Sequence, residues 1–386
     1  MTAVRSYLDH NATSPLRPEA REAMFAALEL AGNASSIHAE GRAARHAIED
    51  AREKLAALIA APSRSIVFTS GGTEANAMAL SPAWLPGNGA ARLFVSSVEH
   101  ASVLRGGRFA AGDVDLLPVD ADGVVALEPA REAFAARHAK GAPFLVSVML
   151  ANNETGAIQP VATLAELAHE FGGLLHCDAA QAMGKIAVDA SAIGADLLTV
   201  SSHKFGGPKG VGALAVLRDG LPVAALIKGG GQERGYRAGT EDVAAIAGLG
   251  AAVDAVAGNK GEQRKIAALR DALEAQIAGI APETVFFSRQ AERLPNTSCF
   301  AVPGMQSETV LIAMDLHGVA VSAGSACSSG KVERSHVLDA MGVSPELGAA
   351  AIRVSLGWNT AQADIERITA AWGAIYGTFA ARRHAA

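Results

Sequence analysis

The sequence predicts an α/β protein: a large domain built on a mostly parallel β-sheet, and a smaller α+β domain. Short apolar runs alternate with helical stretches from about residue 15 to residue 250, which is typical of a parallel sheet covered on both faces. The pattern changes after a polar segment near residue 258. The chain has 386 residues, more than one compact domain usually holds. We therefore expect a large domain at residues 14–258 and a small domain at residues 1–13 and 259–386.

Helical spacing of apolar residues is present in four stretches. Residues 17–30 place Pro18 near the start of a helix, where its fixed φ angle is favourable. Residues 35–60 open on serines, which we expect to cap a long amphipathic helix. Residues 161–171 and 266–280 have the same spacing.

Six short apolar runs predict β-strands, because glycine, proline or polar residues bound each of them. Most are apolar at consecutive positions, as expected for strands that are covered on both faces. The runs are residues 65–70, 92–98, 143–151, 173–178, 195–201 and 211–217.

Charge and hydropathy argue against two classes of partner. The net charge is -6 with both signs mixed along the chain, and without a basic stripe no direct contact with nucleic acid is expected. The sequence does not open on a basic segment followed by an apolar one, and no run is long enough to cross a bilayer. We therefore expect a cytoplasmic protein that has no membrane partner.

The cysteine content argues against a disulfide framework and a structural zinc site, and no metal is expected. There are 3 cysteines, and none of them is part of a Cys-x-x-Cys pair. Cys177 and Cys299 lie in apolar, strand-like runs and are interpreted as core residues. Cys327 lies in a segment at about residues 322–335 that is rich in Ser, Gly and Ala, and such a segment is expected to form a mobile loop. Cys327 is therefore a candidate reactive thiol.

Polar side chains follow the apolar runs, at the edge where open parallel sheets bind their ligands. Gly72 and Thr73 precede a helix and would suit a phosphate, although a simple glycine turn with a helix cap has the same pattern. Seven further polar residues follow the runs. Each of them alone could also be explained as a core histidine, a turn residue or a helix cap. Their occurrence at consecutive strand ends favours one common site. They are His100, Asn153, Asp178, Gln181, Ser201, His203 and Lys204.

One cofactor matches this set of side chains. Pyridoxal 5'-phosphate needs a lysine for a Schiff base, a carboxylate for its pyridine nitrogen, donors for its phosphate and a flat group over its ring. Lys204 must lose its proton to act as a nucleophile or base, which neighbouring cations and partial burial favour. We therefore predict that Lys204 faces inward. A nucleotide site is disfavoured, because the sequence has neither a Walker A loop nor a dinucleotide-binding fingerprint.

A series of motifs runs from residue 7 to about residue 360: YLDHNATSPL, GNASSIH, VFTSGGTEANAMA, VEHASVL, ANNETGAIQP, HCDAAQAMGK, SSHKFGGPKGVGAL, GGGQERGYRAGTE, SAGSACSSG and IRVSLG. In these motifs and in their order the chain resembles the NifS/IscS-type cysteine desulfurases, which belong to the fold-type I, class V aminotransferase superfamily. The resemblance implies a PLP-dependent transferase fold whose large domain has a mostly parallel sheet of seven strands.

The resemblance also implies how the cofactor ring would be held. Lys204 would form the covalent bond to the cofactor, and Asp178 would pair with the pyridine nitrogen. Gln181 would contact the 3-oxygen of the ring. His100 would stack on the ring and assist proton transfer.

The remaining roles that the resemblance implies concern the phosphate and the substrate. Arg353 would hold the substrate carboxylate, for which its planar, two-pronged guanidinium is suited. Asn153 would lie near the ring and the substrate. Thr240 would reach a phosphate in the other subunit of a homodimer. The phosphate donors of the same subunit would be Gly72, Thr73, Ser201 and His203.

Cys327 decides which reaction the resemblance implies. L-cysteine would pass its sulfur to the Cys327 thiolate, leaving L-alanine and a persulfide, and the loop would deliver the sulfur to an acceptor such as an iron–sulfur scaffold protein. The alternatives are a selenocysteine lyase, another class V aminotransferase-type enzyme, and a catalytically idle platform for a scaffold. An idle platform would be expected to lack Lys204, Asp178 or Cys327. The sequence leaves open whether the acceptor serves general iron–sulfur assembly, nitrogenase or tRNA thiolation.

Overall fold

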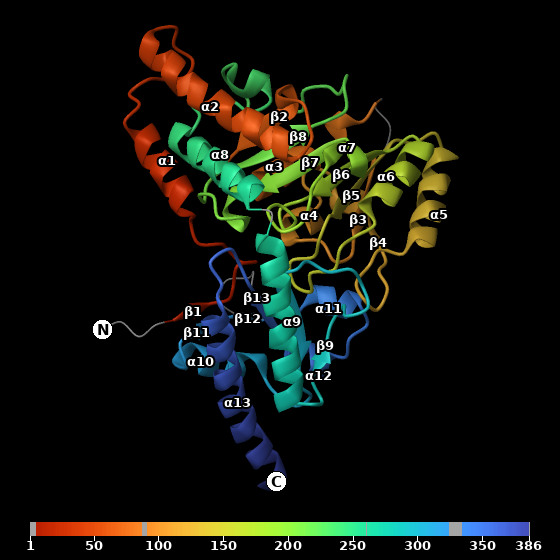
Figure 1. Ribbon diagram of the computed structural model, residues 1–386. Coiled ribbons are helices and arrows are strands. Elements are labelled where there is room, and N and C mark those ends of the chain that lie inside the picture. Colours follow the sequence, from red (N-terminus) through yellow and green to blue (C-terminus); the bar gives the residue numbers. More distant parts are fainter. Residues whose placement is uncertain (1–4, 87–90, 260, 324–333, 386) are drawn as a thin grey trace.

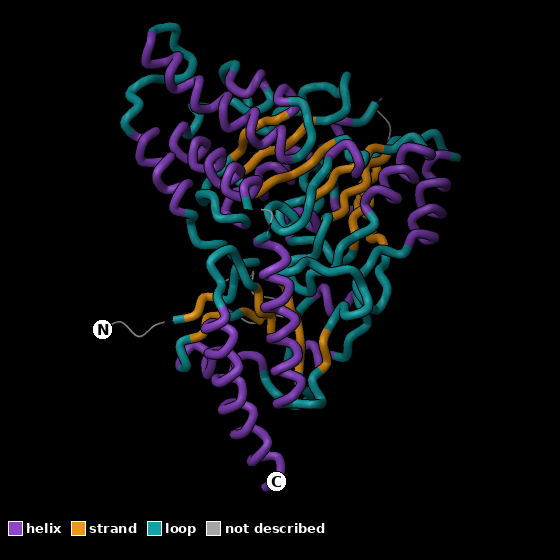
Figure 2. The backbone as a smooth tube through the Cα atoms, viewed as in Figure 1, coloured by secondary structure: helices purple, strands orange, loops and turns teal. Residues whose placement is uncertain are grey.

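The computed structural model describes residues 5–86, 91–259, 261–323 and 334–385 (Figure 1). A large sheet lies in one part of the molecule and smaller sheets lie in the other (Figure 2). None of the helices in the described ranges is both long and apolar enough to cross a bilayer.

The large sheet has seven strands in the order β2-β8-β7-β6-β5-β3-β4. Strand β8 runs antiparallel to both of its neighbours, whereas the other adjacent strands are parallel. The predicted α/β fold with a mostly parallel sheet is therefore confirmed. The strands are β2 (Ile66–Thr69), β3 (Arg92–Ser96), β4 (Val114–Leu117), β5 (Phe144–Met149), β6 (Leu174–Asp178), β7 (Leu197–Ser201) and β8 (Gly212–Val216).

Apolar cores cover both faces of this sheet, which explains why its strands are apolar at consecutive positions. In β5, Leu145 packs into one core, whereas Val146 and Val148 pack into the other. The core that contains Leu145 takes side chains from α3 (Gly72–Ala79) and α4 (Ala101–Leu104). The core on the opposite face takes side chains from α1 (Pro18–Leu28), α2 (Ala39–Leu58), α5 (Leu127–His138), α6 (Val161–Glu170), α7 (Ala190–Ile193) and α8 (Val243–Gly258).

The sequence patterns located all six predicted strands and all four predicted helices, with two corrections. Strand β4 was missed because it lies at the sheet edge and is only partly covered, so that Leu116 is 61% exposed and no continuous apolar run marks it. The predicted serine cap of α2 was wrong. His38 is the N-cap, and its ring nitrogen Nδ1 accepts a hydrogen bond from the Gly41 amide.

The smaller sheets are built from N-terminal residues and from residues 285–355. Strands β12 (Ser322–Ala323), β13 (Ile352–Ser355), β10 (Thr297–Ala301) and β9 (Val285–Phe286) form an antiparallel sheet, and β1 (Ser6–Tyr7) pairs with β11 (Val319–Ala320). The pairing of β1 supports assigning the N-terminal residues to the small domain, whose boundaries remain a proposal. The surrounding helices are α9 (Glu262–Ile280), α10 (Ser307–Leu316), α11 (His336–Ala340), α12 (Pro345–Ala349) and α13 (Gln362–Ala385).

Candidate active site

A cavity of about 440 Å³ lies at the carboxyl ends of the parallel strands. It brings together all but two of the predicted site residues. The predicted residues that line it are Gly72, Thr73, His100, Asn153, Asp178, Gln181, Ser201, His203, Lys204 and Arg353. Thr240 is exposed and is not part of the lining, and Cys327 lies outside the described residues. The sequence missed several others, chiefly Asn11, Thr13, Asn76, Ser102 and Lys209.

The start of helix α3 forms one end of the cavity. Its N-cap, Gly71, has a φ of 153°, a conformation that side chains disfavour, and no side chain caps the helix. A Cβ atom added to Gly72 would lie 3.1 Å from the Cβ atom of Ser201. The missing side chains leave backbone N–H groups and the positive end of the helix dipole facing the cavity, where an anion such as a phosphate is favoured.

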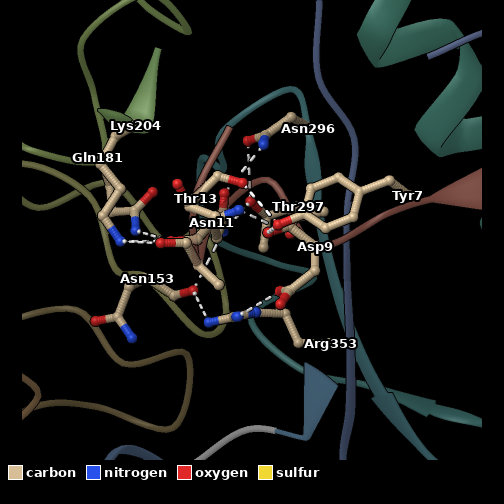
Figure 3. A network of polar contacts seen from close by, with 12 residues as sticks. Tyr7, Asp9, Asn11, Thr13, Asn153, Gln181, Lys204, Asn296, Thr297 and Arg353 are labelled. Atoms are coloured by element: carbon tan, nitrogen blue, oxygen red, sulfur yellow. Dashed lines mark hydrogen bonds and ion pairs between the residues drawn. The ribbon is translucent and has the colours of Figure 1, made fainter. Parts of the chain in front are cut away.

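Lys204 faces inward, as predicted. It lies in the short turn that follows β7, and its Nζ atom donates hydrogen bonds to the backbone oxygens of Asn11, at 2.7 Å, and Ala12, at 3.0 Å. The side chain is half-buried and lines the cavity. Figure 3 shows it beside Gln181, whose Nε2 atom donates to the same Asn11 oxygen at 2.9 Å.

A carboxylate and two imidazoles face the same space. Asp178, at the end of β6, accepts hydrogen bonds from Asn76 Nδ2 at 2.7 Å and from the Ala180 amide at 2.9 Å. Burial, then Lys204, Lys209 and Lys185, lowers the pKa of His203 to about 4. Its ring is therefore neutral at physiological pH, and its Nδ1 atom lies 3.1 Å from Thr13 Oγ1.

His100 is held as a neutral ring with a defined tautomer. Burial lowers its pKa, and Lys204 and His336 lower it further, whereas Asp178 raises it. The Nδ1 atom accepts a hydrogen bond from the Ser102 amide at 3.1 Å. Since a neutral imidazole has one donor and one acceptor nitrogen, the proton is on Nε2.

Arg353 forms the end of the cavity that belongs to the smaller sheets. Its Nη1 atom donates to the backbone oxygen of Asn153 at 3.0 Å, and its Nη2 atom pairs with Asp9 Oδ1 at 2.8 Å (Figure 3). The Nε atom is buried and has no hydrogen-bond partner among the residues that the structure describes. The guanidinium is thus held in one orientation by Asn153 and Asp9, at the edge of the cavity that Arg353 lines.

The segment that carries Cys327 begins and ends beside this end of the cavity. Before it, Ser322 in β12 pairs with Arg353 in β13. After it, Ser335 donates a hydrogen bond to the buried carboxylate of Glu154 at 2.5 Å and caps helix α11. Glu154 directly follows Asn153 in the chain. Both ends of the segment are therefore anchored to strands and side chains around Arg353.

Comparison with known proteins gives the family. The sequence profile of the Aminotransferase class-V family matches residues 6–368. A cysteine desulfurase of Cereibacter sphaeroides is 45% identical over 370 residues, which are 94% of each chain. The cysteine desulfurase IscS of Dictyoglomus turgidum is 42% identical over 365 residues, 93% of this chain and 91% of the other. The chain belongs to the class-V aminotransferase family.

A solved structure shows an equally extensive likeness. The X-ray structure of a NifS-like protein from Rickettsia africae superposes with a TM-score of 0.87 at 34% identity, covering 97% of this chain and 100% of the other. The predicted fold-type I architecture is thereby confirmed.

Class-V aminotransferases use pyridoxal 5'-phosphate, so the predicted cofactor is confirmed at the level of the family. The cavity itself has the groups that this cofactor needs. It offers the uncapped start of α3 for a phosphate, the Asp178 carboxylate for a pyridinium nitrogen and the Lys204 amine for an aldehyde. The residues present fit the cofactor.

The buried carboxyl group of Glu154 should make the free energy of unfolding depend on pH. Burial raises the pKa of its carboxyl from 4.5 to about 7, although Ser335 and Arg353 act in the opposite direction. The carboxyl group of Glu154 therefore binds its proton more tightly in the folded state than in the unfolded chain. The resulting stabilisation is complete below pH 4.5 and is lost as the pH rises through 7. The free energy of unfolding of the wild type should therefore fall by about 3 kcal/mol over this pH range. Glu154→Gln should remove this fall.

The measurement is the free energy of unfolding in urea at pH 5 and pH 8 for the variant and the wild type. Glu166→Gln, an exposed position on α6, is the matched control and should keep the pH dependence of the wild type. Equal pH dependence in Glu154→Gln and the wild type would show that Glu154 does not titrate in this range.

Proposed function

We propose that the cavity binds pyridoxal 5'-phosphate and L-cysteine, and that the sulfur of the substrate passes to Cys327, leaving L-alanine. The predicted cysteine desulfurase activity is confirmed by curated relatives of that name at 42% and 45% identity over most of the chain. The observation that carries the site assignment is that one cavity holds Lys204, Asp178, the start of α3 and Arg353.

The groups around the cavity suit a cofactor that lies between α3 and Arg353. The α3 start, with Thr73, Ser201 and His203, would receive the phosphate. Asp178 would pair with the ring nitrogen, Gln181 would donate to the ring oxygen, and His100 would lie against the ring. When bound, the cofactor supplies an electron sink for the α-carbon of the substrate.

The other residues act on the substrate. Arg353 binds its carboxylate, with Asp9 and the Asn153 oxygen holding the guanidinium in orientation. The Lys204 amine moves the proton at the α-carbon. The Cys327 thiolate attacks the substrate sulfur, so that an S–S bond forms while the Cβ–S bond breaks. The electron pair of the broken bond goes to Cβ, which takes up a proton and becomes the methyl group of alanine.

A homodimer would complete the site. Thr240 is exposed and lies outside the cavity of its own chain, as expected of a residue that reaches a phosphate in a partner subunit. Its segment is anchored by Glu233, which forms a buried, two-pronged ion pair with Arg52. Large exposed apolar side chains also favour association. They include Phe25, Leu28, Ile37, Val223, Leu226 and Ile227.

The name IscS of a relative supports an iron–sulfur scaffold protein as the acceptor. We retain the cytoplasm as the proposed location.

The experiment that tests the function identifies the product. Holoenzyme is incubated with L-cysteine, and alanine, pyruvate and protein-bound sulfur are quantified. We expect alanine and persulfide in equal amounts during the first turnover. A keto acid in place of alanine would indicate an aminotransferase or a lyase instead. A parallel incubation with L-selenocysteine, read as selenide release, separates the desulfurase from a selenocysteine lyase.

A further inference from the structure

A second lysine, Lys185, is buried next to the cavity and contacts Gln181 and Asn11, which line it. Its side chain is only 8% exposed. Its Nζ atom donates hydrogen bonds to Gln181 Oε1 at 2.6 Å and to Asn11 Oδ1 at 2.8 Å. No carboxylate pairs with it in the described part of the chain, and burial lowers its pKa well below the usual value, followed by Lys204 and Arg353. A buried ammonium without a counter-ion is costly, so packing alone does not account for a lysine here.

The N–H groups of Lys185 determine which way the Gln181 carboxamide points. The Lys185 Nζ atom directs its N–H groups at two side-chain oxygens, whereas a carboxamide has a donor end and an acceptor end. Because Lys185 contacts Oε1, the amide nitrogen is directed away from it, toward the Asn11 backbone oxygen at 2.9 Å. One of the two amide hydrogens is used in this bond. The second is available to a ligand oxygen in the cavity that Gln181 lines.

Lys185 orients Asn11 in the same way. Asn11 Oδ1 accepts from Lys185 and from Asn296 Nδ2, which leaves Asn11 Nδ2 to donate to the backbone oxygen of Asn153 at 3.1 Å. Figure 3 shows Asn11 at the centre of this network, between Gln181 and Arg353. The Asn11 backbone oxygen is also the acceptor for Lys204 Nζ. One buried lysine therefore fixes the orientation of the two side-chain amides next to Lys204.

We propose that Lys185 is a positioning residue that fixes the Gln181 carboxamide so that an N–H group of Gln181 faces the ring oxygen of the cofactor. This role rests on the proposed function, because it requires pyridoxal phosphate to occupy the cavity. With Lys185 removed, the carboxamide is free to turn, and its oxygen would then face the ring oxygen and repel it. The cofactor should be held less tightly, and its absorbance should change.

The test uses Lys185→Met, which keeps an unbranched apolar side chain but removes the N–H donors. Apoprotein is reconstituted with pyridoxal phosphate in the absence of cysteine, and the absorbance spectrum and the dissociation constant are measured. We expect a shifted absorbance maximum and roughly tenfold weaker binding, as for the loss of one charge-assisted hydrogen bond. Gln181→Met should give the same effect. The double variant should be no worse than Gln181→Met, because both changes remove the same contact.

Two controls separate this role from a general effect on folding. Lys265→Met changes an exposed lysine on α9 and should leave the spectrum and the affinity unchanged. Thermal unfolding of the apoproteins reports on the fold, and Lys185→Gln serves the same purpose if Lys185→Met does not fold, since a carboxamide no longer dictates the orientation of Gln181.

A wild-type spectrum and affinity in Lys185→Met would overturn the role of Lys185, as would losses that add up in the double variant. Neither result would affect the proposed function, which is tested by alanine formation. A wild-type protein that binds no pyridoxal phosphate would overturn both.

Discussion

Lys204→Ala should abolish the activity and release the cofactor, with at least a thousandfold loss of alanine formation from L-cysteine. The wild-type side chain reaches into the cavity, where the backbone oxygens of Asn11 and Ala12 hold its Nζ atom. Nothing in an alanine side chain replaces this amine as a nucleophile or base. The purified variant should therefore be colourless, whereas lysine-bound pyridoxal phosphate gives the wild type a yellow colour.

Borohydride reduction followed by peptide mapping checks the position of the covalent bond. The label should lie on Lys204 in the wild type and should be absent from the Lys204→Ala variant. The mapping is needed because Lys185 is a second amine beside the same Asn11. A label on Lys185, or a yellow Lys204→Ala protein, would contradict the assignment. Lys265→Ala should behave as the wild type, and equal unfolding temperatures of the apoproteins would exclude a defect in folding.

The sheet and the residues at its strand ends could be predicted from sequence because their signals are local. An apolar run followed by a polar residue places that residue at the carboxyl edge of a parallel sheet, whatever the rest of the chain does. Asp178 and Lys204 were found in this way, and both line the cavity. The edge strand β4 lacked such a run, since only one of its faces is well covered.

The missed residues reach the site through contacts between distant parts of the chain. Asp9 pairs with Arg353, which is 344 positions away, because the backbone of Asp9 bridges to Ser355, the last residue of β13. Asn11 contacts Thr297 across 286 positions. No periodic pattern reports such pairings. Lys185 was visible within the motif HCDAAQAMGK, but its burial without a carboxylate is a property of the tertiary structure alone.

Cys327→Ser should block persulfide formation and reduce alanine formation at least a hundredfold, while the cofactor stays bound. The described residues argue for this thiol by eliminating the other two. Burial raises the pKa of Cys177 and of Cys299, and nearby carboxyl groups raise both further. Both are therefore thiols at neutral pH, whereas the nucleophile must be a thiolate. Neither Cys177 nor Cys299 lines the cavity.

The described residues before Cys327 limit how far it can lie from Arg353. It is four positions beyond Ala323, the end of β12, and an extended chain covers at most about 14 Å over that length. Strand β12 pairs with the strand that carries Arg353, which lines the cavity. The measurement is intact-protein mass after one turnover with L-cysteine, together with the absorbance spectrum of the cofactor. Ser329→Ala, in the same segment, is the matched control and should still gain one sulfur. A Cys327→Ser protein that gained sulfur at the wild-type rate would show that Cys327 is not the sulfur acceptor. Such a result is not expected from Cys177 or Cys299, because both thiols are fully buried.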